Sequence, residues 1–237
     1  MVLTRSIIYF VFMILSTIFF SLLIIALGII LPSIYSDKLS TWWGKFNIFL
    51  QRWICGLILE IEGQENIPSS KAIIMCKHQS TWETIALRGL LPFKQSWVVK
   101  KELINIPLFG IALKFSGAIS LDRKSGRKAV VKLIKEGKSC LANGRLIVIF
   151  PEGTRTAYGQ KAKYSPGGAI LAESSGCPVV PIAHNAGIFW ARRSVKKYPG
   201  VIKVKIGAPI KTENRKASEI LKEVEEWIES QMDVLIS

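Results

Sequence analysis

An uncharged apolar run near the N-terminus constrains this chain more than any other feature. The 26 residues from Ser6 to Leu31 include no charged side chain and are rich in Ile, Phe and Leu. As a helix the run would extend about 39 Å, which exceeds a bilayer core of roughly 30 Å. The alternative is a secretory signal peptide with Arg5 in its positively charged n-region, but the run is too long and no small-residue cleavage site follows it. We therefore expect a retained membrane helix.

A second amphipathic segment follows between Trp42 and Leu59. Its apolar and aromatic residues recur at helical spacing, while Lys45 and Arg52 fall outside their stripe. One interpretation is a core helix of the soluble part. We favour a helix at the membrane interface, where tryptophan is enriched and lysine can reach the headgroups. The two segments predict a membrane-anchoring helical hairpin over residues 1–62, followed by one domain over residues 63–237.

The charge of the chain limits its partners. The formal net charge is +15, from 32 basic and 17 acidic residues, which favours nucleic acid, anionic lipid or a phosphorylated substrate. No zinc-finger spacing, RNP-like aromatic motif or long basic helix accompanies it. We therefore expect anionic membrane lipid as a partner and no nucleic acid. Basic residues are concentrated after the apolar run, which predicts a main domain on the cytoplasmic side of the inner membrane.

The four cysteines predict neither disulfides nor a metal site. They show no paired spacing, as expected for buried thiols in a reduced cytoplasmic compartment. Cys76 lies two residues before His78, but no second ligand pair accompanies them. We expect no metal.

Strand-like and helix-like segments alternate after the hairpin. The expected strands are Ala72–Cys76, Ser96–Val99, Ala118–Leu121, Leu146–Phe150, Val179–Ile182 and Ile202–Ile206. The expected helices are Thr84–Leu91, Pro107–Phe115, Arg127–Asn143, Gly167–Ser174 and Ala217–Met232. This alternation predicts an α/β fold with a mixed, largely parallel sheet flanked by helices. Ligands of such sheets bind at the loops that follow the strands.

One of the two histidines stands at the end of an expected strand. His78 comes directly after the run Ala72–Cys76, and Glu83 follows five residues later. Histidine suits general-base work because its ordinary pKa lies near working pH, and a carboxylate can orient its ring. The same pair is equally typical of a structural hydrogen bond.

A second block, Phe150-Pro-Glu-Gly-Thr-Arg155, follows another apolar strand. Pro151 and Gly153 predict a tight turn that exposes backbone N–H groups. Arg155 offers a planar fork of donors suited to phosphate. Glu152 would hold that arginine or a substrate hydroxyl in place.

A third block, Gly117-Ala-Ile-Ser-Leu-Asp-Arg123, ends in an Asp-Arg pair. One interpretation is a solvated salt bridge, which stabilises little. The functional interpretation gives Arg123 as a second cation for an anionic substrate.

In this order the blocks resemble the 1-acyl-sn-glycerol-3-phosphate acyltransferase family, within the wider glycerolipid acyltransferases. The family's first motif, His followed after four residues by Asp, is similar to His78-Gln-Ser-Thr-Trp-Glu83. Its third motif is matched residue for residue by Phe150–Arg155. The first motif departs from the family at Glu83, where aspartate is usual. Glutamate adds one methylene, so the substitution puts the geometry of the pair in question.

Two further stretches extend the resemblance. The family's second motif is similar to Gly117–Arg123, which the related stretch Lys100–Gly110 precedes. Its fourth motif, a valine-proline strand, is similar to Cys177–Ile182. The resemblance spans roughly residues 72–187, and a set of motifs in this order is highly specific.

The resemblance implies acyl transfer from a thioester of acyl-carrier protein or coenzyme A to the sn-2 hydroxyl of lysophosphatidate, which forms phosphatidate in phospholipid biosynthesis. In that mechanism His78 takes the hydroxyl proton and Glu83 fixes the tautomer of the ring. No Gly-x-Ser-x-Gly elbow offers a serine nucleophile, and no P-loop or dinucleotide fingerprint predicts a cofactor. The implied phosphate site consists of Arg123, Gly153, Thr154 and Arg155, with Lys100 or Lys101 as further donors.

Two other functions remain open. One keeps the enzyme class but uses glycerol 3-phosphate, an aminolipid or another lysophospholipid as acceptor. The other is a non-catalytic basic protein that binds a membrane surface or nucleic acid. His184, the second histidine, is expected to pack beside the site and not to take a second catalytic role.

Overall fold

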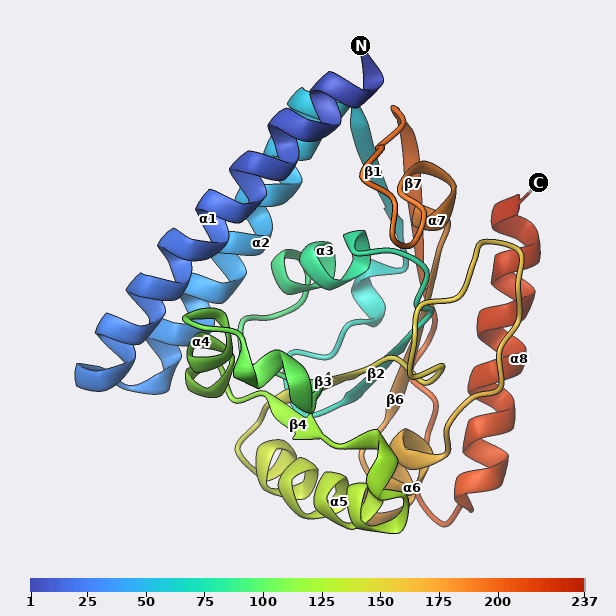
Figure 1. Cartoon of the computed structure of the whole chain (residues 1–237). Coiled ribbons are helices and arrows are strands. Elements are labelled where there is room, and N and C mark those ends of the chain that lie inside the picture. The colour runs from blue at the N-terminus through green and yellow to red at the C-terminus, as the bar shows by residue number, and fades with distance from the viewer. Residues whose placement is uncertain (237) are drawn as a thin grey trace.

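A seven-stranded sheet with helices on both faces forms the centre of the molecule (Figure 1). The computed structural model describes residues 1–236. The strands are β1 Leu57–Glu62, β2 Ile73–Cys76, β3 Gln95–Lys100, β4 Ile119–Leu121, β5 Leu146–Ile149, β6 Val179–His184 and β7 Gly200–Ile206. The helices are α1 Val2–Ile30, α2 Ser33–Cys55, α3 Trp82–Leu90, α4 Phe109–Phe115, α5 Arg127–Ala142, α6 Gly167–Ser175, α7 Ala186–Phe189 and α8 Ala217–Ile236. Three short 3-10 turns are η1 Gln64–Asn66, η2 Lys101–Asn105 and η3 Arg123–Ser125.

The sheet has the order β1-β7-β6-β2-β5-β3-β4. All neighbouring strands run parallel except β6 and β7, which are antiparallel. The predicted mixed, largely parallel sheet is therefore confirmed, and all six expected strands are present. The seventh strand, β1, was not expected.

The second helix differs from its prediction at both ends. It covers Ser33–Cys55, whereas the apolar spacing predicted Trp42–Leu59. Gly56 ends it in a left-handed conformation, with φ 69° and its N–H donating to the carbonyl of Arg52. The chain then enters β1, which pairs with β7. The predicted boundary at residues 62 and 63 thus falls after a strand of the sheet, and a separate hairpin unit remains a prediction.

Four aromatic side chains of α2 are exposed, whereas Trp43 packs against the core. Trp42, Phe46, Phe49 and Trp53 are between 41% and 68% exposed. The buried face of this helix is mostly polar and includes Ser36, Asp37, Ser40, Asn47 and Gln51. A core helix would bury these aromatic residues, so their exposure favours the interface interpretation, which stays a prediction. An apolar outer face favours contact with lipid.

Helix α1 lies beside α2 along most of its length (Figure 1). It is long and apolar enough to cross a membrane, with a mean hydropathy of 2.8 in an 18-residue window. Only 17% of that window is buried inside the protein. This helix is consistent with the expected membrane anchor.

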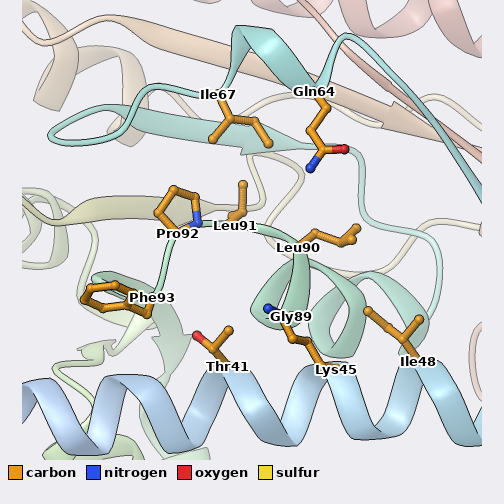
Figure 2. A pocket seen from close by; sticks show the side chains of 10 residues that line it. All are labelled: Thr41, Lys45, Ile48, Gln64, Ile67, Gly89, Leu90, Leu91, Pro92 and Phe93. Carbon is orange, nitrogen blue, oxygen red and sulfur yellow. The ribbon is translucent and has the colours of Figure 1, made fainter.

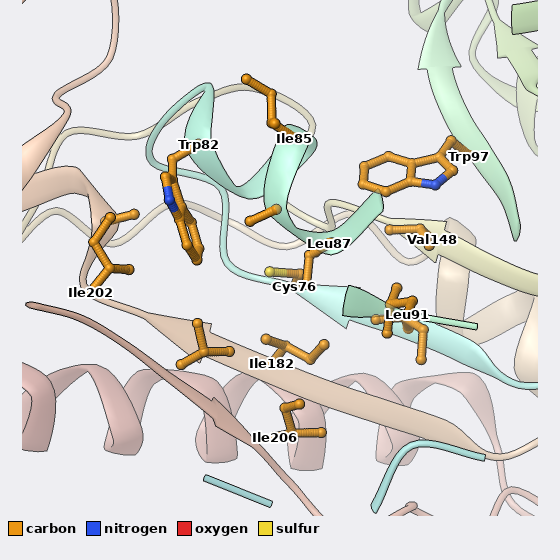
Figure 3. Packing of buried hydrophobic residues seen from close by; sticks show 14 of the residues in the cluster. Cys76, Trp82, Ile85, Leu87, Leu91, Trp97, Val148, Ile182, Ile202 and Ile206 are labelled. Carbon is orange, nitrogen blue, oxygen red and sulfur yellow. The ribbon is translucent and has the colours of Figure 1, made fainter. Parts of the chain in front are cut away.

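The core forms two layers, one on each face of the sheet. Ile74, Val148 and Ile182 point toward the face that α3 and the N-terminal helices cover. Figure 3 shows this layer, in which Trp82 of α3 and Ile202 of β7 enclose the end of β2. The alternate residues Ile73 and Ile147, one position away along the strands, pack under α5, α6 and α8.

Candidate active site

The carboxyl ends of four neighbouring strands bring the predicted site residues together. Strands β2, β5, β3 and β4 are adjacent and parallel, so their ends meet at one edge of the sheet. His78 follows β2, and Phe150–Arg155 follows β5. Lys100 ends β3 and Arg123 follows β4. Four segments that are distant in the sequence therefore share one site.

His78 and Glu83 form a direct hydrogen-bonded pair. His78 Nδ1 lies 2.8 Å from Glu83 Oε1. The same carboxylate oxygen accepts the backbone N–H groups of Gln79 at 2.8 Å and Ser80 at 2.7 Å. An oxygen that accepts two N–H donors faces the imidazole as an acceptor, so Nδ1 carries the ring proton and Nε2 is left as the base. The extra methylene of Glu83 therefore does not prevent contact.

Glu83 is fully buried at the start of α3. Burial raises the pKa of its carboxyl, but the neighbouring His184, the hydrogen bond from His78 and the backbone N–H of Ser80 lower it, and the net pKa lies below the ordinary value. The group is thus ionised at working pH. Its position on the first turn of α3 also suits a negative charge.

The imidazole of His78 is stacked on a ring of the second block. The rings of His78 and Phe150 lie 4.0 Å apart between centroids, with planes 13° apart. Phe150 in turn packs against Trp97 at 5.9 Å. This packing fixes the ring so that its base nitrogen faces a cavity that His78 lines.

Glu152 occupies a structural position behind His78. Its side chain is fully buried, accepts the backbone N–H of His78 at 2.7 Å and pairs with Lys77 at 2.8 Å. Lys77 also binds Glu229 of α8 at 2.7 Å, and Tyr164 donates to that carboxylate at 2.9 Å. Within residues 1–236 the predicted contact of Glu152 with Arg155 is not present, because its oxygens bind the histidine loop, Thr156 and Lys77 instead.

The Lys77 ammonium is held by two carboxylates. Burial lowers its pKa, but the hydrogen bonds that it donates to Glu152 and Glu229 overcome this effect and raise the pKa above the ordinary value. Removing any one of these three charged groups would leave a buried charge unpaired, which is strongly destabilising.

A cavity of about 760 Å³ opens in front of His78. Its walls come from α1, α3, α4, the end of β3 and the loop after β5. Most of the lining is apolar, and the cationic side chains that line it are Arg88, Lys100, Arg123, Arg155, Arg192 and Arg193. Of the predicted phosphate-site residues, Lys100, Arg123, Gly153, Thr154 and Arg155 line this cavity. Lys101 does not, and its exposed ammonium lies 3.8 Å from Asp122.

Gly153 gives the turn after β5 a conformation that favours glycine, and a cation lies beside it. Its φ is 70°, a left-handed conformation that favours glycine, and an added Cβ would lie 3.6 Å from Arg123 Nη1. Its own N–H donates to the carbonyl of Phe150, so the turn uses that donor. Within residues 1–236 the N–H groups of Thr154 and Arg155 donate to no other residue, which leaves them available to a ligand.

Three arginines at the cavity were not predicted from the sequence: Arg88 of α3 and the adjacent pair Arg192 and Arg193. Arg192 donates to the carbonyl of Arg155 at 2.8 Å, and Arg193 lines the same wall. They lie between α7 and β7, a segment without a recognisable motif. The adjacent pair of arginines in a strongly basic chain was the only signal for them.

His184 packs beside the site, as expected. Its Nε2 donates to the carbonyl of Lys77 at 2.9 Å, and its Nδ1 accepts the N–H of Ala186 at 3.2 Å. Both ring nitrogens are thus engaged with the backbone. Burial lowers the pKa of His184, although Glu83 raises it, so the ring is neutral.

A second cavity of about 620 Å³ lies between α2, η1 and the loop after α3 (Figure 2). Its lining includes Lys45 of α2, Gln64 of η1 and Phe93 of the loop. None of the predicted site residues lines it, so the acid–base chemistry belongs to the cavity at His78.

Comparisons with known proteins agree with this geometry. A family model described as Acyltransferase matches residues 58–185. A 1-acyl-sn-glycerol-3-phosphate acyltransferase of Pseudomonas aeruginosa is 43% identical over 194 residues, which cover 80% of this chain and 75% of that protein. A protein of the same name from Cocos nucifera is 29% identical over 163 residues, covering 68% of this chain and 53% of that one.

The fold also matches a solved structure. The crystal structure of the 1-acyl-sn-glycerophosphate (LPA) acyltransferase from Thermotoga maritima superposes with a TM-score of 0.83 and covers 100% of this chain and 96% of that one. The sequence identity of the two chains is 22%, so this likeness concerns the fold. It includes the N-terminal helices as well as the sheet.

Proposed function

The chain belongs to the 1-acyl-sn-glycerol-3-phosphate acyltransferase family, and from this premise we propose that it transfers a fatty acyl group from a thioester to the sn-2 hydroxyl of 1-acylglycerol 3-phosphate. The product is phosphatidate. The motifs predicted the family, and the comparisons confirm it. One observation supports the reaction above all others: His78 turns its unprotonated Nε2 to an apolar cavity with cations among its lining residues, while Glu83 holds Nδ1.

In the proposed mechanism His78 acts as the general base. Its Nε2 takes the proton of the acceptor hydroxyl as the hydroxyl oxygen attacks the thioester carbonyl. Glu83 keeps the ring in the required tautomer and stabilises the imidazolium that forms. The proton then passes from Nε2 to the departing thiolate sulfur, which restores the neutral base.

The negative charge of the acceptor's phosphate is bound by hydrogen-bond donors from the neighbouring loops. We assign the acceptor's phosphate to Arg123, Arg155 and the backbone N–H groups of the turn after β5, with Lys100 nearby. Arginine suits this role because its planar fork matches two phosphate oxygens.

The acyl chains would lie against α1. Phe10, Met13, Ile14 and Ile18 of this helix line the cavity, while neighbouring positions such as Leu15 and Phe19 are exposed on the outside. A lipid substrate can therefore move between the bilayer and the cavity along apolar surface. The basic domain then lies on the cytoplasmic side, at anionic lipid headgroups, with acyl-carrier protein or coenzyme A as the carrier of the donor.

A panel of donors and acceptors tests the proposal. Purified protein in mixed micelles is given acyl thioesters of both carriers, with lysophosphatidate, glycerol 3-phosphate or a neutral lysolipid as the acceptor. We expect turnover with lysophosphatidate, and roughly a hundredfold or greater loss of kcat in His78→Ala with membrane binding retained.

Two results would contradict the proposal. A clear preference for a neutral acceptor would remove the phosphate assignment. Near-normal turnover by His78→Ala would remove the general base. Exposed Lys128 of α5 offers a control position, because Lys128→Ala changes no group that lines the cavity.

A further inference from the structure

Arg88 of α3 is a buried cation that no counter-ion satisfies. The residue is 6% exposed, and its Nη1 has no hydrogen-bond partner. Within residues 1–236 its guanidinium forms no hydrogen bond or ion pair, and it lines the cavity at His78. Burial lowers the pKa of Arg88 to about 9, against the opposing effect of Asp37. A desolvated guanidinium without an acceptor is costly, so a ligand that brings one would be favoured.

In the described part of the chain, the polar groups near Arg88 are engaged with other residues and form no hydrogen bond with its guanidinium. Its guanidinium lies 4.8 Å above the ring of Trp97, whose indole N–H donates to Gln95 at 2.8 Å. Both carboxylate oxygens of Asp37 are bound by Arg145, at 2.6 and 2.7 Å. The unused hydrogen-bonding capacity of this part of the cavity lining therefore consists of donors, on the Arg88 guanidinium and on the indole N–H of Trp43.

The guanidinium lies on the same wall as the base but farther along it. The rings of His78 and Phe150 lie 4.0 Å apart between centroids, and those of Phe150 and Trp97 lie 5.9 Å apart. The guanidinium carbon of Arg88 lies 4.8 Å from the centroid of Trp97. The face of α3 that begins at Thr81 reaches Arg88 two helical turns later, about 10 Å along the helix axis. A group beside Arg88 is thus separated from the reacting carbonyl by a stretch of apolar lining.

We propose that Arg88 binds an acceptor oxygen, a hydroxyl or a keto group, on the acyl chain being transferred. This inference rests on the proposed function, in which the thioester carbonyl lies at His78 and its chain continues into the cavity. It names the substrate class as acyl thioesters that are oxygenated at some distance from the thioester. The guanidinium donates to the oxygen, and no covalent step is involved.

A guanidinium does not suit a mere stop at the end of the cavity. A large apolar side chain would limit chain length without the cost of burying a charge. An unsubstituted chain beside Arg88 leaves its N–H groups without an acceptor. A hydroxylated chain supplies one, so Arg88 discriminates by the oxygen.

A matched donor series tests this inference on the full-length protein. The donors have one chain length and carry a hydroxyl near the thioester, at mid-chain, near the methyl end, or not at all; the acceptor is lysophosphatidate throughout. We expect kcat/KM to be roughly ten- to a hundredfold higher for one hydroxyl position than for the unsubstituted chain, as for a hydrogen bond to a charged group.

Substitutions at Arg88 identify the group responsible. In Arg88→Met, which keeps a long side chain without donors, the ratio of hydroxylated to unsubstituted kcat/KM should fall to about one. Arg88→Lys should retain part of the preference. Arg215→Met is the matched control, because Arg215 lies on the exposed connection before α8 and pairs with Glu223 at 2.7 Å, outside the cavity.

The outcomes separate this inference from the proposed function. Wild-type turnover of unsubstituted donors without preference at any hydroxyl position overturns the role of Arg88 and leaves the reaction standing. A shift of preferred length among unsubstituted chains in Arg88→Met, with no hydroxyl preference in the wild type, also overturns it. No turnover of any donor contradicts the reaction itself. Should Arg88→Met fail to fold, the wild-type ratio and Arg88→Lys decide the question.

Discussion

At the scale of single residues, Glu83 stands where the family has aspartate. Its Oε1 accepts the ring N–H of His78 and two backbone N–H groups, all within 2.8 Å. The loop is thus built to the length of glutamate.

Shortening this side chain should therefore weaken the base. In Glu83→Asp the carboxylate withdraws from the ring by about one bond length, and we expect kcat to fall roughly ten- to a hundredfold with KM little changed. Glu83→Gln should lose more, because the ring loses its anionic partner. Steady-state kinetics of both variants measures this. Full activity of Glu83→Asp would mean that the side-chain length does not limit catalysis.

His184 should make the fold sensitive to mild acid. Its pKa is lowered by burial, so the unfolded chain binds a proton more readily than the folded one. The stability it contributes is present above the unfolded pKa of about 6.5 and is lost as pH falls below it. The lowered pKa of Glu83 acts in the same direction, but only below its ordinary value of 4.5.

The melting temperature in detergent should therefore fall between about pH 7 and about pH 5.5. His184→Gln keeps an N–H that can donate to the carbonyl of Lys77, and it should reduce this slope whatever its own melting temperature. An unchanged slope in that variant would assign the acid sensitivity to other groups.

At the scale of elements, the last helix supports the first loop of the site. Glu229 of α8 binds Lys77, which pairs with Glu152, and that carboxylate holds the backbone of His78. Lys77 and Glu229 lie 152 positions apart in the sequence. The C-terminal helix thus takes part in orienting the base, although it lines no part of the cavity.

Removing the charge of Glu229 should therefore disturb catalysis from a distance. We expect Glu229→Gln to lower kcat about tenfold while KM for the acceptor stays close to normal, because Lys77 loses an ion-pair partner in a buried place. Glu226→Gln is the control, since Glu226 is exposed and pairs only loosely with Lys222 at 3.8 Å. Equal kinetics for the two variants would contradict the orienting role.

The sequence predicted the elements better than it predicted their contacts. Six strands follow from short apolar runs, and the site residues follow from their position at strand ends. The strand β1 escaped prediction because its first residues, Leu57 to Leu59, continue the apolar spacing of α2, and only Gly56 marks the break. The role of Glu152 could not be predicted because its ion-pair partner Lys77 lies far away in the sequence. Only the pairing of β2 with β5 brings the two residues together.

At the scale of the whole molecule, the expected membrane helix is also a wall of the catalytic cavity. Helix α1 gives one face to the outside and another to the cavity at His78. Its apolar composition predicted a membrane helix, but nothing in its spacing predicted that it would form a wall of the site.

Two substitutions on α1 can separate these roles. Thr17 lines the cavity, so Thr17→Trp should narrow it and lower kcat/KM for long acyl donors more than for short ones. Leu15→Trp is the matched control, because Leu15 is 56% exposed and lies outside the cavity. Measurements with donors of several lengths compare them. If both variants respond alike, α1 acts only as an anchor.

The pairing of β1 with β7 has a consequence for the order in which the chain folds during synthesis. It joins Leu57 to Gly200, so the edge of the sheet closes only after most of the chain has left the ribosome. The apolar helices emerge first and can enter the bilayer while the strands that follow are still unpaired. Contacts between such distant residues form slowly, since a long loop must close before they stabilise anything. The apolar N-terminal helix is thus synthesised long before the strands that form the active site can pair.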